Sequence, residues 1–236
     1  MAAKIAVIIT ANVEWKAARS LFPDVEIKVY PFGEMFDPPA GRLFEMEQSG
    51  RLRFLHGGWG KISAAASAQY ILDHWSPDVL INLGTCGGFA GEVDLGTILL
   101  VERTVVYDIV EQMGDSDEHI AHYTTDIDLS WLRGNAPYPV LRTLLVSGDR
   151  DLVPGELSKL KQQYGAVAGD WESGAIAFVA ARNRVRCLIL RGVTDLVTSE
   201  SGEAYDGTMQ VFTERTGEMM KRLVDGLGGW LRMIDY

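Results

Sequence analysis

The order of apolar and amphipathic segments predicts an α/β protein in which helices cover both faces of a central mixed β-sheet, a three-layer sandwich. Two observations support this fold class. Short apolar runs alternate with helical stretches along all 236 residues, and no linker, change of composition or repeat of about 20–50 residues interrupts them. We therefore expect residues 1–236 to form a single domain.

The N-terminal segments predict the first strand and helix. Residues 4–10 form an apolar run rich in β-branched residues, which is typical of a buried strand. A helix is expected from Asn12 to Leu21, with Asn12 as a possible cap. Short, half-exposed strands are expected within 25–56, where the prolines of 31–41 predict a loop.

The middle of the chain is rich in glycine and alanine. Glycines open an alanine-rich helix predicted within 57–75, and the apolar residues 79–82 predict a buried strand that ends in a glycine-rich turn. Another strand is predicted over 97–107. Residues 111–138 are polar and irregular, so they are expected to form a mobile loop.

The C-terminal part continues the alternation of strands and helices. The last helix is expected to be amphipathic, because Val211, Met219, Leu223 and Leu227 fall on one face. The predicted strands span 140–146, 165–172 and 185–193, and the predicted helices span 156–164, 173–183 and 208–230.

Composition excludes several classes of function. The 22 Lys and Arg against 32 Asp and Glu give a formal charge of −10, which disfavours nucleic-acid partners. The two cysteines, Cys86 and Cys187, form no disulfide framework and suit a reduced cytoplasmic setting. No apolar run is long enough to cross a membrane, so no membrane partner is expected.

Small and acidic residues follow the predicted strands where each strand ends. Ligands of α/β sheets bind beyond the carboxyl ends of strands, so we expect these residues to gather at one rim. No standard nucleotide-binding motif is present, and His119 and His122 lack partners for a zinc site. No metal and no organic cofactor is therefore expected.

Paired carboxylates at strand ends are suited to cleavage of a glycosidic bond. That reaction needs an acid for the leaving group and a carboxylate that stabilises an oxocarbenium-like sugar. Burial raises a carboxyl pKa and lets the group hold a proton near neutral pH. Glu172 and Asp195 occupy such positions, although acidic helix caps would give the same pattern.

Six motifs together resemble the nucleoside phosphorylase/nucleosidase superfamily, and most of all its methylthioadenosine/S-adenosylhomocysteine nucleosidase branch. The resemblance covers residues 4–228 and implies a nucleoside phosphorylase-like fold, a small nucleoside substrate and a homodimer. The motifs are TANVE at 10–14, GWGKISAA at 58–65, INLGTCGGF at 81–89, VSGD at 146–149, DWESGAIA at 170–177 and RGVTD at 191–195.

The resemblance implies catalytic roles for three carboxylates. Glu172 matches the glutamate that holds the ribose hydroxyls, and Asp195 matches the aspartate that donates a proton or hydrogen bond to purine N7. Thr194 takes the hydroxyl position before this aspartate. Glu14 lies one residue before the position of the water-activating glutamate, and a loop adjustment would let it serve. The alternative for Glu14 is an exposed residue in the first helical turn.

The resemblance also implies binding roles in the glycine segment. Thr85, with Gly84 and Gly87, matches a Gly-Ser-x-Gly-Gly turn whose backbone approaches the sugar and base. Phosphorylases commonly place a phosphate-binding Arg where this sequence has Asn82. Because no Arg-containing phosphate loop follows the first strand either, hydrolysis is favoured over phosphorolysis.

Two substitutions depart from the family pattern. Trp171 replaces a Met that lies against the sugar, and Asp151 replaces the aromatic residue that stacks on the base. Asp151 would either accept hydrogen bonds from the base or face solvent, and Leu152 follows where main-chain groups contact the base. The expected function is hydrolysis of a purine nucleoside or a 5′-modified adenosine. The alternatives are a phosphorylase and a non-catalytic nucleoside-binding protein.

Overall fold

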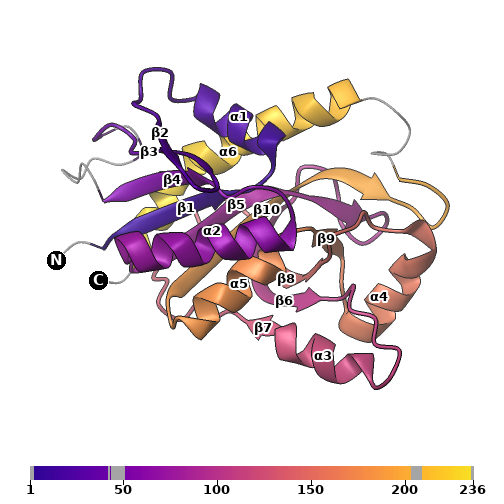
Figure 1. The fold of residues 1–236 in the computed structure, drawn as a ribbon. Coiled ribbons are helices and arrows are strands. Elements are labelled where there is room, and N and C mark those ends of the chain that lie inside the picture. The colour runs from indigo at the N-terminus through magenta and orange to yellow at the C-terminus, as the bar shows by residue number, and fades with distance from the viewer. Residues whose placement is uncertain (1–2, 42, 44–50, 203–208, 235–236) are drawn as a thin grey trace.

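A mixed β-sheet runs through the computed structural model, which describes residues 3–41, 43, 51–202 and 209–234. Helices α1 (Asn12–Ser20) and α6 (Met209–Arg232) cover one face, and α2 (Gly60–Trp75) and α5 (Ser173–Arg182) cover the other (Figure 1). The predicted three-layer α/β class with a mixed sheet is therefore confirmed.

The sheet is open at one end and closed at the other. From one edge the order is β2, β3, β4, β1 and β5; β5 then pairs with both β10 and β9, and β6 and β8 connect those two strands. The strands are β1 (Ile5–Ile9), β2 (Lys28–Tyr30), β3 (Gly33–Phe36), β4 (Leu52–His56), β5 (Val79–Phe89), β6 (Ile98–Val106), β7 (Thr125–Asp126), β8 (Leu141–Ser147), β9 (Ala168–Asp170) and β10 (Arg186–Val197).

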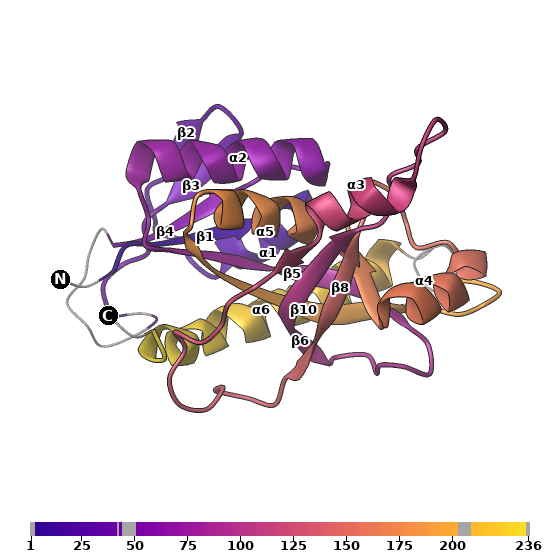
Figure 2. The same ribbon diagram turned by 90° about the horizontal axis from the view of Figure 1, so that it is seen from below.

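Closure makes the strands run in two directions around the ring. β10 is parallel to β5 but antiparallel to β6, and β9 is antiparallel to β5. The strands of the ring therefore do not all point the same way, as they would in an open parallel sheet. Figure 2 shows α3 (Ser116–Tyr123) and α4 (Leu157–Tyr164) beside one end of this ring.

A β-bulge interrupts the pairing of β10 with β5. Val193 pairs with Cys86 and Asp195 pairs with Gly87, so Thr194 is an extra residue on the β10 side. A bulge bends the strand and changes the direction in which the next side chain points. The irregularity lies directly before Asp195 and so decides where that carboxylate is placed.

Alternating side chains of the central strands form a core on each face. Ile5, Val7 and Ile9 pack against the cluster that contains Trp230 of α6, whereas Ala6 and Ile8 face α2 and α5. Met219, Leu223 and Leu227 of α6 are buried as predicted, but Val211 is 39% exposed.

No helix within the described ranges is both long and apolar enough to span a membrane.

Several element boundaries differ from the sequence expectations. Ala11, not Asn12, is the N-cap of α1. The expected loop at 31–41 contains β3, and the expected loop at 111–138 contains α3 and β7. Residues 44–50 of the region expected to form short strands lie outside the described residues. Tertiary pairing with neighbouring strands stabilises β3 and β7, a contribution that local sequence pattern does not encode.

The glycine segment after residue 82 is a strand and not a turn. β5 continues to Phe89 because β10 pairs with it along its whole length. A Cβ at Gly84 would lie 1.6 Å from Nη1 of Arg191, and a Cβ at Gly88 would lie 2.6 Å from Val93. Glycine is required here because neighbouring side chains occupy the space beside the strand, not because the chain reverses.

Candidate functional site

A cavity of about 360 Å³ opens between the carboxyl end of β1, the glycine segment of β5 and the ends of β9 and β10. Its volume lies in the range of small-molecule sites. The three predicted catalytic carboxylates, Glu14, Glu172 and Asp195, all line it. The predicted binding residues that line it are Thr85, Gly87, Asp151, Leu152 and Trp171.

Two predicted binding residues lie behind the cavity lining. Gly84 faces the guanidinium group of Arg191, and Thr194 is 2% exposed within the bulge of β10. The Thr194 hydroxyl donates to Oδ1 of Asp195 over 3.3 Å. Both residues are therefore placed to support groups that line the cavity.

Glu14 reaches the cavity from the first turn of α1. Its Oε1 accepts hydrogen bonds from the backbone N–H of Thr85 at 2.5 Å and from the Thr85 hydroxyl at 2.7 Å. The backbone N–H of Ala11 lies 3.4 Å from Oε2. Glu14 is only 4% exposed, so it is not an exposed residue of the first turn. Burial raises its pKa, although Arg191 and the Thr85 donors oppose the shift.

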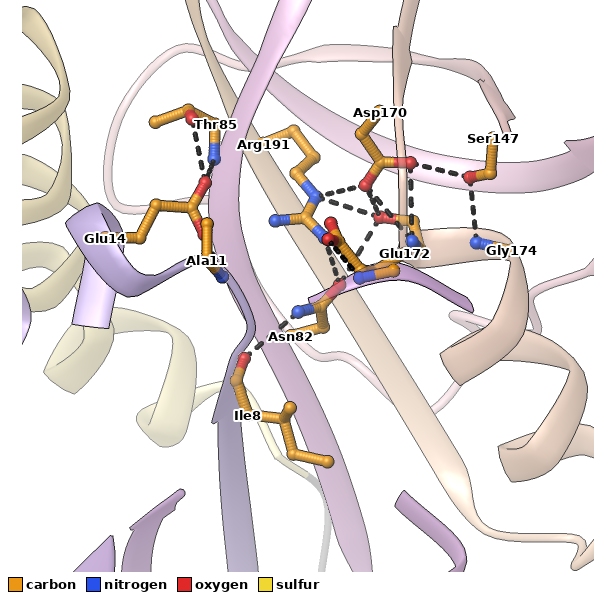
Figure 3. A network of polar contacts seen from close by, with 12 residues as sticks. Ile8, Ala11, Glu14, Asn82, Thr85, Ser147, Asp170, Glu172, Gly174 and Arg191 are labelled. Atoms are coloured by element: carbon orange, nitrogen blue, oxygen red, sulfur yellow. Dashed lines mark hydrogen bonds and ion pairs between the residues drawn. The ribbon is translucent and has the colours of Figure 1, made fainter. Parts of the chain in front are cut away.

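Arg191 lies beneath the cavity with its side chain fully buried in β10. Its Nε donates to Oγ of Ser173 and lies 2.8 Å from Oδ2 of Asp170, and Nη2 donates to Oδ1 of Asn82 at 2.7 Å. Asn82 in turn donates to the carbonyl of Ile8. These contacts connect β1, β5, β9 and β10 through one guanidinium group (Figure 3).

One nitrogen of Arg191 has no hydrogen-bond partner among the described residues. This Nη1 is buried and is the guanidinium nitrogen that points towards Glu14 (Figure 3). A Cβ at Gly84 would stand 1.6 Å from Nη1 and 3.0 Å from Oε1 of Glu14. The Nη1 donor of Arg191 and the Oε1 acceptor of Glu14 therefore both lie close to Gly84, behind the cavity lining and next to Thr85.

Sequence reasoning missed Arg191, Asp170 and Ser173 as parts of the site. The sequence does contain a sign of this network: Arg191 is a charged residue inside the predicted apolar strand 185–193. A buried Arg requires paired carboxylates, so acidic partners could have been expected. Asn82, which was considered only as a missing phosphate ligand, was a similar signal. It is fully buried and bonded to Arg191.

Glu172 is buried at the start of α5. It is 6% exposed, and its Oε1 accepts the backbone N–H of Gly60 at 3.1 Å. Burial and the neighbouring charge of Asp170 raise its pKa to about 8, and Arg191 opposes the shift. The carboxyl group is therefore able to hold or release a proton near neutral pH.

Negative charge exceeds positive charge at the cavity floor. If Glu14, Asp170 and Glu172 were all ionised, they would carry −3 against +1 on Arg191, a net charge of −2. Desolvation makes that state costly, so the cluster favours retaining a proton. Such a site attracts developing positive charge on a ligand and repels an anion.

Acidic, apolar and aromatic side chains all line the cavity. A Cβ at Gly87 would lie 3.2 Å from both Oδ2 of Asp195 and Cδ1 of Leu152, so these side chains flank Gly87. Arg150 and the exposed Asp151 line the cavity as well. Trp59 and Trp171, which also line it, stack with ring centroids 5.9 Å apart.

Phe212 of α6 also lines the cavity and is half-buried. It was not predicted as a site residue, yet it supplies an aromatic side chain in a site where Asp151 cannot stack.

Within the described ranges, no three His, Cys, Asp or Glu side chains are grouped so as to hold a metal ion. The arrangement is suited to acid–base chemistry by carboxylates on an uncharged ligand.

Comparisons with known proteins identify the family and the fold of this chain. The model of a family described as the phosphorylase superfamily matches residues 4–227. Among solved structures, the chain is similar to the 5′-methylthioadenosine/S-adenosylhomocysteine nucleosidase of Campylobacter jejuni, with 16% identity and a TM-score of 0.74. That match covers 97% of this chain and 98% of the other.

Two further solved structures show the same fold. The nucleosidase of the same description from S. pneumoniae, with the transition-state inhibitor MT-ImmA, has 17% identity and a TM-score of 0.73, and the match covers 98% of this chain and 100% of that one. The enzyme from Neisseria meningitidis, in complex with methylthio-immucillin-A, has 19% identity and a TM-score of 0.69, with 94% and 98% covered. At these identities the likeness establishes the fold.

The contact between Gly84 and Arg191 predicts a large effect of a single methyl group. Gly84→Ala would place Cβ on Nη1 of Arg191, which has to move away from Asp170 and Asn82. We expect the free energy of unfolding, measured by urea denaturation, to fall by about 3 kcal/mol. Gly155→Ala is the control, because a Cβ there meets nothing within 4 Å. Equal stability of the two variants would contradict the described packing.

The raised pKa of Glu172 predicts a pH-dependent stability. The folded state favours the protonated carboxyl, so its stabilising contribution is complete below the ordinary pKa of 4.5 and is lost as the pH rises through about 8. Urea denaturation should therefore show that Glu172→Gln, which does not titrate, flattens this loss of stability between about pH 5 and pH 9. Glu26→Gln, at an exposed position, should leave the wild-type pH dependence unchanged. An unaltered pH dependence in Glu172→Gln would refute the shift.

Proposed function

This chain belongs to the phosphorylase superfamily, and from that membership and the geometry of its cavity we propose that it is a nucleosidase. It hydrolyses the N-glycosidic bond of a purine nucleoside or a 5′-modified adenosine and releases the free base. In this proposal residues 1–236 act as one catalytic domain. The protein works in the cytoplasm, and its two free, buried cysteines support this part of the proposal.

The convergence of Glu14 and Thr85 at the cavity wall, with Arg191 buried behind them, carries the proposal. Glu14 Oε1 accepts two hydrogen bonds from Thr85, and Nη1 of Arg191 approaches from the other side. A carboxylate acceptor and a single cationic donor match the hydrogen-bonding needs of a water molecule that is losing a proton. Because Glu172 and Asp195 line the same cavity, the nucleophile would meet a bound nucleoside there.

The proposed reaction forms one bond and breaks one. The water oxygen bonds to C1′ of the ribose while its proton passes to Glu14, and the C1′–N9 bond breaks with its electron pair moving to the base. A proton from the carboxyl group of Asp195 reaches N7, so the purine leaves neutral. Solvent then takes the proton from Glu14 and returns one to Asp195.

Glu172 would act on the sugar. A carboxylate next to the ribose accepts hydrogen bonds from its hydroxyl groups and stabilises the positive charge that develops at C1′. The N–H of Gly60 fixes one of its oxygens, and Arg191 offsets part of the cost of ionising it. The negative surroundings of Glu172 thereby favour the oxocarbenium-like state over the neutral ground state.

Charge at the cavity floor favours water over phosphate as the nucleophile. A phosphate dianion would have to approach Glu14 and Glu172, which repel it. Asn82, at the position where phosphorylases carry a phosphate-binding Arg, is fully buried and bonded to Arg191 and Ile8. Neither the charge nor the donor set therefore suits an anionic nucleophile.

A phosphorylase is the second candidate, and Arg150 is the observation that favours it. Arg150 lines the cavity, although it is already paired with Glu156 at 3.2 Å. Base release that needs phosphate would support this alternative.

The departures at Asp151 and Trp171 favour a third candidate, a non-catalytic nucleoside-binding protein, which would bind nucleosides without turnover.

The reaction is tested by base release in phosphate-free buffer, followed by ultraviolet absorbance. The substrates are methylthioadenosine, S-adenosylhomocysteine, futalosine-type nucleosides, inosine and guanosine. We expect Asp195→Asn, Glu172→Gln and Glu14→Gln each to lower turnover at least about 100-fold, because each removes an acid–base or charge-stabilising group. Asp94→Asn, which alters an exposed carboxylate, is the control. Full activity of the Asp195 or Glu172 variant would refute the mechanism.

We also propose that the protein is a homodimer. Ile62 at the start of α2 is 84% exposed, and Val110 and Met113 in the segment after β6 are 74% and 96% exposed. The ion pair between Lys61 and Asp108 holds these two segments together. Clustered exposed apolar side chains are typical of a surface that another chain covers.

Light scattering after size-exclusion chromatography tests the dimer. Ile62→Asp and Met113→Asp are expected to shift the protein towards the monomer, because each places a charge in the apolar surface. Val29→Asp is the matched control, since Val29 is 82% exposed on another element, β2. A monomeric wild-type protein, or three variants that behave alike, would contradict the proposed interface.

A further inference from the structure

A second cavity, of about 280 Å³, lies between the C-terminal end of α5, the short strand β7 and the first residues of β10. Figure 1 shows β7 next to α5. Within the described ranges, the lining of this cavity shares no residue with that of the catalytic cavity. Its volume is at the lower end of the range for small-molecule sites. The cavity is therefore large enough for a small ligand and distinct from the site of the proposed reaction.

Arg184 belongs to the lining and has an unfavourable backbone conformation. Its N–H donates to the carbonyl of Ala181, and the N–H of Val185 donates to the carbonyl of Ala180. These two bonds are those of a Schellman motif at the end of α5, and they place Arg184 at a φ of +57°. Glycine or asparagine is usual there, because most L side chains are strained in the left-handed region. The fold alone would therefore favour a residue other than arginine.

The guanidinium group of Arg184 does not offset this strain through contacts with the protein. The residue is exposed, and its side chain makes no hydrogen bond or ion pair with any residue that the structure describes. Strained residues are typical of binding sites, where the side chain is retained for a ligand and not for the fold. The donors of this guanidinium group are thus available to a ligand in the cavity.

The acidic side chains that the structure describes in this lining already have partners. Asp126 forms an ion pair with Arg103 of β6. Asp128 accepts the backbone N–H of Ser130 at 2.8 Å. Hydrogen bonds from Ser130, together with the charge of Arg186, lower the pKa of Asp128. Both carboxylates are therefore stable in the ionised form without a further cation.

Positive charge exceeds negative charge around the cavity. Arg186 also lines it, and its Cζ lies 5.8 Å from the ring centroid of Trp131. Among the described residues, the guanidinium groups of Arg184, Arg186 and Arg103 stand against two carboxylates, in a chain whose formal charge is −10. A local excess of positive charge attracts anions, and guanidinium groups bind carboxylate or phosphate groups through paired hydrogen bonds.

The cavity also has an apolar part. Ala177 and Cys187 are buried, and Ile127 and Val185 are half-buried; all four line the cavity. Burial raises the pKa of the Cys187 thiol to about 12, so this side chain is an uncharged part of the lining. An apolar group placed in the cavity would remove this surface from water.

From this geometry we propose that the cavity between α5, β7 and β10 binds a small organic anion. The carboxylate or phosphate group of the ligand binds the guanidinium group of Arg184, and its apolar body lies against Ala177, Val185 and Cys187. This second site is independent of the nucleosidase function.

The test is a ligand-observed NMR titration of the wild-type protein at constant ionic strength. Phenylacetate and phenyl phosphate combine an apolar body with an anionic group, phenylacetamide lacks the charge, and inorganic phosphate lacks the apolar body. We expect each organic anion to bind at least about ten times more tightly than phenylacetamide or inorganic phosphate, because a charge-assisted hydrogen bond contributes a factor of this size. The tighter of the two organic anions identifies the preferred head group.

Arg184→Asn separates a role in binding from a role in folding. Asparagine lacks the guanidinium group but adopts the left-handed conformation more readily. We therefore expect about a tenfold loss of affinity for the organic anions, with an unchanged or higher melting temperature. Arg182→Gln is the matched control, because Arg182 is the last residue of α5 and does not line the cavity. Arg150→Gln, in the catalytic cavity, should also keep the wild-type affinity.

Four results would overturn the second site. The first is a wild-type protein that binds neither organic anion, or binds phenylacetamide or inorganic phosphate equally well. The second is wild-type affinity in Arg184→Asn. The third is a lower melting temperature of that variant, which would assign the guanidinium group to the fold. The fourth is loss of binding in Arg150→Gln, which would place the probes in the catalytic cavity.

Discussion

The buried guanidinium group of Arg191 is the interaction on which the rest of the site depends. It lies in β10 and contacts Asp170 at the end of β9 and Asn82 in β5, so it fixes the relative positions of three strands. A buried charge is tolerated only when it is paired and hydrogen-bonded. The carboxylates, the amide and the absence of a side chain at Gly84 are therefore consequences of placing one Arg in the interior.

The same charge cluster links stability to the proposed chemistry. Burial raises the pKa values of Glu14 and Glu172, and the positive charge of Arg191 limits the rise. With a pKa of about 8, Glu172 exchanges a proton near neutral pH, as acid–base catalysis requires. The cost of holding negative charge in a desolvated cavity falls when positive charge develops on a bound sugar, so the arrangement favours the state in which the glycosidic bond is breaking.

Closure of the sheet through β10 determines how side chains reach the cavity. In an open parallel sheet they would come from loops beyond the strand ends. Here Thr85 and Asp195 lie inside long paired strands, and the bulge at Thr194 turns Asp195 towards the cavity. Strands are rigid supports, so these groups are held more firmly than loop residues would be. Trp59 also lines the cavity, and the backbone N–H groups of Gly60 and Lys61 after it are hydrogen-bonded to Glu172 and Asp149.

The sequence by itself determined the fold class, the superfamily and the residue types of the site. Periodicity marks buried strands and amphipathic helices, and the motifs around Thr85, Glu172 and Asp195 are local in the chain. The sequence could not decide the extent of β5 and β10, because pairing between strands far apart in the chain lets glycines continue as strand. Only the tertiary structure decided that Glu14 is buried against Thr85, that Arg191 underlies the cavity and that Trp59 stacks on Trp171. Those contacts join residues 18 to 112 positions apart, and their energies depend on burial and pairing that a local pattern does not contain.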